Sequence, residues 1–113
     1  YLGKFTFFRR TSFMNVSLNI QAIESVKSAI LTETAELYNI LADNDESELY
    51  SGAISKIASV IAMEYILARR LGISFAAVDS QILDLLTVAE ESGHFLETEF
   101  SDMSELHKHL KKR

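Results

Sequence analysis

The 113-residue chain contains no cysteine and no proline, and only four glycines. Without cysteine it can form no disulfide, no zinc-thiolate site and no cysteine nucleophile, and a reducing compartment suits it, so we expect a cytoplasmic protein. Without proline, and with so few glycines, long helices meet few of the residues that break them. Hydrophobic residues make up 48% of the chain and charged residues 24%, which is typical of one globular domain.

Positive charge is scarce over most of the sequence. The formal net charge is -5, and all 16 acidic residues lie between Met14 and His107. That stretch holds few cations: Lys27, Lys56, Arg69 and Arg70. An acidic body of this kind repels phosphate backbones, so we expect no nucleic-acid partner.

The first residues differ from the rest of the chain. Residues 1–13 are aromatic and basic and show no sustained periodicity. They are too few and too charged to span a membrane, and they lack the long apolar stretch of a secretory signal, so we expect no membrane partner. We interpret residues 1–16 as an N-terminal extension of uncertain origin and residues 17–113 as a single helical domain.

The remaining sequence predicts helices and no strands. Apolar residues recur at steps of three and four, and no window shows sustained alternation. Gly72 and Gly93 provide C-terminal stops, and Ser101 or Asp102 can cap the last helix. Helices are expected over residues 20–42, 48–71 and 75–91, in a short turn near 95–100, and from about residue 102 onward. The fold class is therefore all-α, a four-to-five-helix bundle.

The third of these helices carries an apolar stripe. Ser74 can cap its start, and Gly93 follows its end. The stripe that we expect to be buried consists of Ile82, Leu85, Leu86 and Ala89.

The second helix is apolar almost all the way round between Ile54 and Leu71. Lys56, Ser59 and Arg70 mark one narrow polar line at helical spacing. A helix of this kind is central in its fold. One small bundle cannot cover such a helix on every side, so we expect a homo-oligomer, either a dimer or a tetramer.

Two carboxylates on the first helix are candidate metal ligands. Glu33 lies on a heptad line between Val26 and Ile40, and Glu36 follows it by one helical turn. Side chains at this spacing project the same way, as the oxygen ligands of a divalent cation such as Mg²⁺ must. The alternative is that both acids sit at a helix edge and face water.

Glu64 is a candidate buried acid. It lies among Val60, Ile61 and Leu67, on a face of the second helix that should be buried. Burial of an unpaired carboxylate destabilises a fold, so Glu64 should meet a cation of a neighbouring helix or subunit, or sit in a polar cleft. We favour a structural ion pair over a catalytic role.

Three stretches share features with a known family. The first is the run Glu33–Leu37, the second is the end of the apolar helix, Tyr65–Ser74, and the third is Phe100–Leu110. Together they resemble the MazG-like family of all-α nucleotide pyrophosphohydrolases, and the third is similar to the tail of a short bacterial branch found in bacilli and their relatives. The resemblance covers roughly residues 20–113.

The resemblance implies a degenerate metal motif. In the family, an ExxE pair on the first helix and an ExxD pair on the second hold Mg²⁺, which neutralises the triphosphate and positions water for cleavage between the α and β phosphates. Glu33 and Glu36 match the first pair, whereas counting back from Leu71 places the second pair at Lys56 and Ser59. Lys56 could instead pair with Glu33 or Glu36, or contact a phosphate.

These observations leave three hypotheses for the function. The leading one is a MazG-like homo-oligomer with weak or lost pyrophosphohydrolase activity, retained for binding a nucleotide or a protein partner. The alternative is an active Mg²⁺-dependent nucleoside triphosphate pyrophosphohydrolase that uses Glu33 and Glu36 with acids from another helix or subunit. The third is a structural adaptor that needs neither metal nor nucleotide. The sequence contains no HExxH, Gly-rich phosphate loop or serine nucleophile elbow, so the catalytic residues stay unknown.

Overall fold

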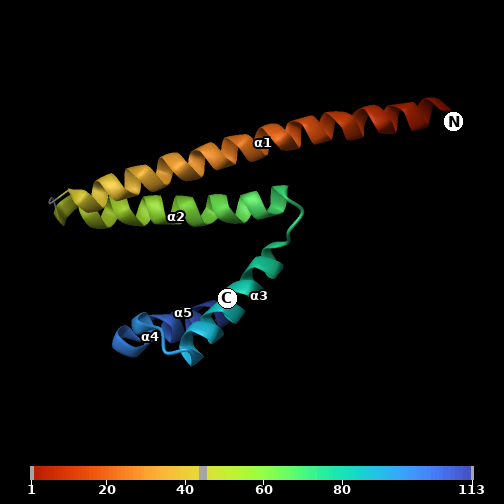
Figure 1. The fold of residues 1–113 in the computed structure, drawn as a ribbon. Helices are drawn as coiled ribbons and strands as arrows, with labels where there is room; N and C mark the ends of the chain where they lie inside the picture. The colour runs from red at the N-terminus through yellow and green to blue at the C-terminus, as the bar shows by residue number, and fades with distance from the viewer. Residues whose placement is uncertain (1, 44–45, 113) are drawn as a thin grey trace. The chain divides into compact units, whose positions relative to one another are not determined.

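The computed structural model describes the backbone of residues 2–43 and 46–112 and the side chains of residues 16–43 and 49–112. This part of the chain forms five helices and contains no strand (Figure 1), so the predicted all-α fold class is confirmed. Contacts divide the chain into two compact units, Tyr1–Gly72 and Ile73–Arg113, which we describe separately. The single domain expected over residues 17–113 stays a prediction.

The first unit is a helical hairpin. Helices α1 (Leu2–Ala42) and α2 (Glu46–Arg70) lie side by side (Figure 1). α1 begins well before the expected residue 20, because the preceding segment contains no proline and its single glycine, Gly3, lies at the very start. The side chains of residues 1–15, which make up nearly all of the N-terminal extension, lie outside the described residues.

Two contacts between α1 and α2 set the register of the hairpin. Nδ2 of Asn19 donates a 2.9 Å hydrogen bond to the backbone oxygen of Arg70, a carbonyl in the last turn of α2 that has no partner within its helix. Near the connection between the helices, a Cβ on Gly52 would lie 3.2 Å from Cδ1 of Ile40. The absence of a side chain at position 52 therefore allows the two helices to approach closely.

The second unit contains three helices: α3 (Phe75–Glu91), α4 (Phe95–Phe100) and α5 (Asp102–Lys111). Oγ of Ser74 accepts a 3.0 Å hydrogen bond from the backbone N–H of Ala77, which confirms the predicted cap. Gly72 and Gly93 have φ angles of 86° and 70° and follow the ends of α2 and α3. Both predicted stops are confirmed, because glycine adopts this left-handed conformation without strain.

At the start of α5, Ser101 occupies the N-cap position as expected, but the side-chain capping hydrogen bond is made by Glu97. Ser101 occupies the N-cap position with φ of 60° and makes no side-chain capping hydrogen bond. The Glu97 carboxylate instead accepts a 2.7 Å hydrogen bond from the Ser104 hydroxyl and a 2.8 Å bond from the Ser104 backbone N–H. These bonds lower the pKa of Glu97, because they stabilise the charged carboxylate.

α3 packs against α5 through one side of its surface. Leu86 is buried there with 7% of its surface exposed, and Nδ1 of His107 lies 3.2 Å from Oε1 of Glu90. The expectation that Leu85 is buried is wrong, since 60% of this residue is exposed. Successive helical residues point about 100° apart, so the burial of Leu86 leaves Leu85 on a different side of α3.

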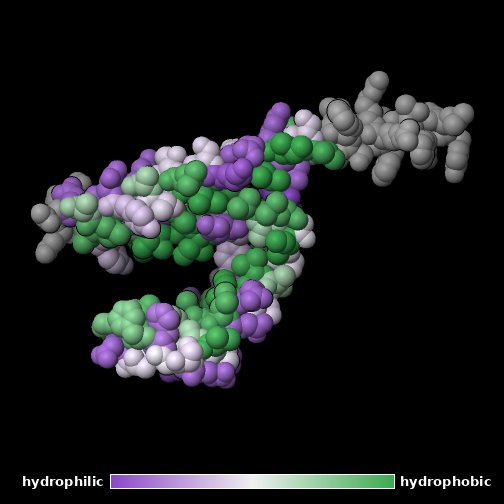
Figure 2. Space-filling model, viewed as in Figure 1, coloured by the Kyte–Doolittle hydropathy of each residue, from purple (hydrophilic) through white to green (hydrophobic). Residues whose placement is uncertain are grey.

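Few side chains are buried anywhere in the described residues. Ala68 and Leu86 are the only buried hydrophobic residues among them. Large apolar side chains remain exposed on every helix, and Figure 2 shows apolar surface gathered along the hairpin. Within each unit, the described residues therefore form little of the central core that the composition predicts.

Candidate functional site

Glu33 and Glu36 of α1 face Lys56 of α2. Nζ of Lys56 lies 3.1 Å from Oε2 of Glu33 and forms a second ion pair with Oε2 of Glu36. The side chains of Lys56 and Glu33 are 26% and 27% exposed, and that of Glu36 is 46% exposed. The ion pairing that the sequence suggested for Lys56 is therefore present.

Helix geometry explains why these three side chains meet. Glu33 and Glu36 are three residues apart, so they project from neighbouring points on one face of α1. Lys56 lies on the adjacent helix, in the register set by Gly52 near the connection. The residue opposite the two acids is therefore Lys56, and its assignment to a metal-motif position stays a prediction.

The Lys56 ammonium and the carboxylates of Glu33 and Glu36 stabilise one another electrostatically. The hydrogen bonds of Lys56 with Glu36 and then with Glu33 raise its pKa, because both stabilise the ammonium over the neutral amine. Lys56 therefore stays charged at neutral pH, and its ammonium occupies a position between two carboxylate groups. One positive charge offsets part of the repulsion between the two acids.

Ser59 and Glu64, the other two candidate site residues, differ in how far they are buried. Ser59 follows Lys56 by one turn of α2 and is half-buried. Glu64 is exposed, so the chain alone does not bury this carboxylate as the apolar pattern suggested.

The metal role of Glu33 and Glu36 stays a prediction. Over residues 16–43 and 49–112, no three or more His, Asp or Glu side chains gather in a way that could hold a metal ion. The oxygen donors that lie together are those of Glu33 and Glu36, with the Lys56 ammonium beside them.

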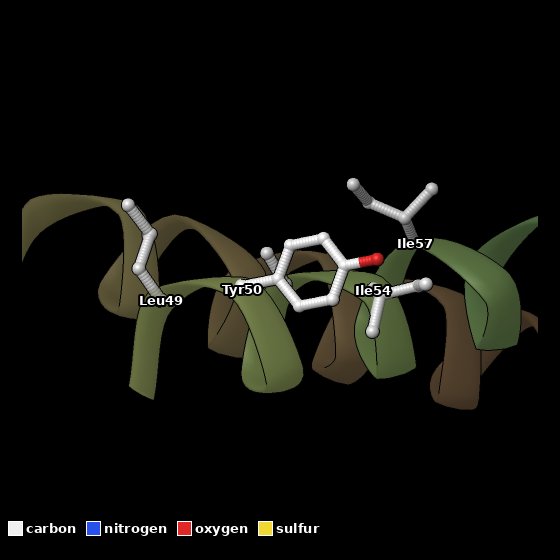
Figure 3. Close-up of a pocket in the computed structure, with 5 residues that line it drawn as sticks. Leu49, Tyr50, Ile54 and Ile57 are labelled. Carbon is white, nitrogen blue, oxygen red and sulfur yellow. The ribbon is translucent and has the colours of Figure 1, made fainter. Parts of the chain in front are cut away.

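A second feature is an apolar depression on α2 (Figure 3) that the sequence did not single out. It has a volume of about 400 Å³ and is lined by Leu49, Tyr50, Ala53, Ile54 and Ile57. The only signal for it in the sequence is the surplus of apolar residues on α2, which did not show which of its faces α1 leaves open.

Comparison with known proteins agrees with the helical fold. The model of the MazG-like family matches residues 16–103, a range that includes Glu33, Glu36, Lys56 and Ser59. No curated protein and no solved structure matches the chain. Because the family match covers most of its length, the chain belongs to the MazG-like family, whose helical fold is related to that of the nucleotide pyrophosphohydrolases.

Proposed function

We propose that this protein is a MazG-like protein whose pyrophosphohydrolase activity is weak or lost and which binds a nucleotide or a protein partner in the cytoplasm. The observation that carries the proposal is the contact of Lys56 with both Glu33 and Glu36. A tethered ammonium takes the place beside two carboxylates where a catalytic member of the family would bring a divalent cation.

The donors present do not fit Mg²⁺. This ion requires near-octahedral coordination by oxygen atoms, and it is repelled by a neighbouring ammonium. Glu33 and Glu36 supply carboxylate oxygens, but Lys56 and Ser59 stand where the resemblance implies two further acids. Mg²⁺ would have to displace Lys56 from both carboxylates before it could bind.

The experiment compares the natural chain with a variant in which the motif is restored. We expect calorimetric titration of the natural chain with Mg²⁺ to show no binding up to millimolar concentrations. The double variant Lys56→Glu and Ser59→Asp supplies the two missing acids, and it should bind Mg²⁺. Restored binding would support the inferred register without depending on activity.

Lys27→Glu is the matched control, because it reverses another lysine of the hairpin. Lys27 forms an exposed ion pair with Glu24 within α1, 3.0 Å away. This variant should resemble the natural chain and not bind Mg²⁺. If it gained as much binding as the double variant, net charge rather than the motif would be responsible.

A pyrophosphate-release assay with the common nucleoside triphosphates separates the remaining hypotheses. Metal-dependent turnover by the natural chain that disappears in Glu33→Ala would identify an active enzyme and overturn the proposal. Titration with a nonhydrolysable nucleotide then tests nucleotide binding directly. If the chain neither releases pyrophosphate nor binds the nucleotide, a structural adaptor is favoured.

A further inference from the structure

Three aromatic rings lie together at α4 in the second unit, and we call them the aromatic cluster: His94, Phe95 and Phe100. The rings of His94 and Phe95 are stacked, with centroids 5.9 Å apart and planes inclined by 27°. The rings of Phe95 and Phe100 meet edge to face, with centroids 6.3 Å apart and planes inclined by 74°. Phe95 and Phe100 are each 63% exposed, so much of both π surfaces is open to a ligand.

Hydrogen bonds hold the aromatic cluster in place. Nδ1 of His94 accepts a 3.2 Å hydrogen bond from the backbone N–H of Leu96, so this nitrogen carries no proton and the ring has a fixed orientation. α4 is held against α5 by the bonds that the Glu97 carboxylate accepts from Ser104. A ligand that binds these rings would therefore lose little free energy to ordering them.

The charge beside the aromatic cluster is negative. Glu99 follows Phe95 by one helical turn, so both side chains project from the same side of α4. Glu99 is exposed and forms no hydrogen bond or ion pair within residues 16–43 and 49–112. Residues 71–107 contain no lysine or arginine. A cation is therefore the ligand that the π surfaces and the Glu99 carboxylate would both attract.

We propose that the aromatic cluster and Glu99 bind a basic segment of a partner protein, with an arginine of that segment over an exposed phenylalanine ring. A guanidinium is planar, so it can stack on a ring and donate hydrogen bonds in its own plane to a carboxylate. A lysine ammonium is compact and strongly hydrated, so it fits this combination of groups less well. The segment should therefore be rich in arginine rather than lysine.

A nucleobase is the main alternative ligand, since bases stack on exposed aromatic side chains. The charge of the site opposes this alternative. A nucleotide or nucleic acid would bring phosphates close to Glu99, and residues 71–107 offer no lysine or arginine that could neutralise them. The acidic surroundings therefore favour a basic protein segment.

The aromatic cluster shares no residue with the candidate site. Glu33, Glu36 and Lys56 belong to the first unit, whereas the cluster belongs to the second. Binding at the cluster requires neither Mg²⁺ nor a nucleotide, so it can be tested without reference to the metal motif. A chain that fails to bind basic peptides could still lack Mg²⁺ binding as proposed, and the reverse also holds.

The first test titrates the full, isotope-labelled chain with a peptide of alternating arginine and glycine residues and follows the backbone amide signals by NMR. The signals that shift should come mainly from residues 94–100, and the shifts should saturate. A peptide with lysine in place of arginine should bind about 5-fold more weakly, because its ammonium groups stack less well on the rings.

The second test separates this site from general attraction to an acidic protein. The double variant Phe95→Leu and Phe100→Leu keeps apolar side chains at exposed positions, so it should fold, but without the π surfaces it should bind the arginine peptide at least ~5-fold more weakly. Glu99→Gln removes the free carboxylate and should weaken binding about 2–5-fold. Asp84→Asn removes the same charge from an exposed position of α3 and should leave binding unchanged.

Four outcomes would overturn the inference. The first is a natural chain that shows no saturable binding of the arginine peptide, and the second is binding that shifts amides outside residues 94–100 instead. The third is equal binding by the double leucine variant, and the fourth is equal weakening by Glu99→Gln and Asp84→Asn, which would indicate an effect of net charge. Stronger shifts of the same amides with adenosine monophosphate would assign the rings to a nucleobase.

Discussion

Ile40 of α1 lies so close to Gly52 of α2 that a Cβ on Gly52 would be 3.2 Å from Cδ1 of Ile40. Alanine is favoured over glycine within a helix by about 1 kcal/mol, and the neighbouring atom is the end of a flexible side chain that can shift. Gly52→Ala should therefore raise the free energy of unfolding, measured in urea, by about 0.5 kcal/mol. Gly52→Leu should lower it by about 1–3 kcal/mol through overpacking.

The effect of Gly52→Ala on stability should depend on the side chain at position 40. Ile40→Val removes the Cδ1 atom that a new Cβ would meet. Gly52→Ala should therefore stabilise the Ile40→Val background more than the natural chain. Equal effects in both backgrounds would show that the two side chains are not coupled.

Alkaline pH should weaken the hairpin through Lys56. Its pKa is raised above 10.5 in the folded chain by the hydrogen bonds with Glu36 and Glu33. The resulting stabilisation is fully present below pH 10.5 and is lost as the pH rises through the raised value. Urea unfolding at several alkaline pH values should show a smaller loss of stability in Lys56→Met than in the natural chain.

The control for the alkaline experiment is Lys27→Met. Lys27 pairs with Glu24 on the exposed surface of the same hairpin, so its removal should leave the dependence on pH unchanged. A profile of Lys56→Met that matched that of the natural chain would contradict the assignment of this dependence to Lys56.

Acidic pH should loosen the junction between α4 and α5. The pKa of Glu97 is lowered from 4.5 by its hydrogen bonds with Ser104, so their stabilisation is present above pH 4.5 and is lost as the pH falls through the lowered value. Hydrogen exchange at the Ser104 amide should accelerate in this range, relative to other α5 amides. Glu97→Gln should remove that dependence, whereas Glu99→Gln, an exposed neighbour in α4, should preserve it.

Adjacent leucines of α3 should differ in their effect on stability. Leu86 is buried against the rest of its unit, whereas Leu85 is 60% exposed. Leu86→Ala should lower the free energy of unfolding by about 2–3 kcal/mol, and Leu85→Ala by less than about 0.5 kcal/mol. Similar losses in thermal unfolding would indicate that α3 has a second packed face.

Local sequence signals predicted several helix ends well. Ser74, Gly72 and Gly93 mark helix ends through their own side chain or backbone, so they could be recognised without knowledge of the fold. Leu85 could not be placed, because an apolar stripe does not show which of its edges the neighbouring helix covers. The start of α1 was missed because residues 1–13 show no sustained apolar periodicity, which is the signal that predicted the other helices.

The candidate site was predictable only in part. The ion pairing of Lys56 with Glu33 and Glu36 could be suggested from the sequence, whereas the metal-motif positions assigned to these residues and to Ser59 stay predictions. The exposure of Tyr50 and Ile54 was not predictable, because the second helix is apolar on several sides and the pattern alone does not show which side α1 occupies. The contacts between α1 and α2 determine which side of α2 is covered.

The charge beside Glu33 and Glu36 belongs to the polypeptide itself. An ion held by coordination can be removed by a chelator or lost when its supply falls, but a lysine side chain cannot diffuse away. The hairpin should therefore keep its helicity and melting temperature in EDTA, and its folding in the cell should not follow the availability of magnesium.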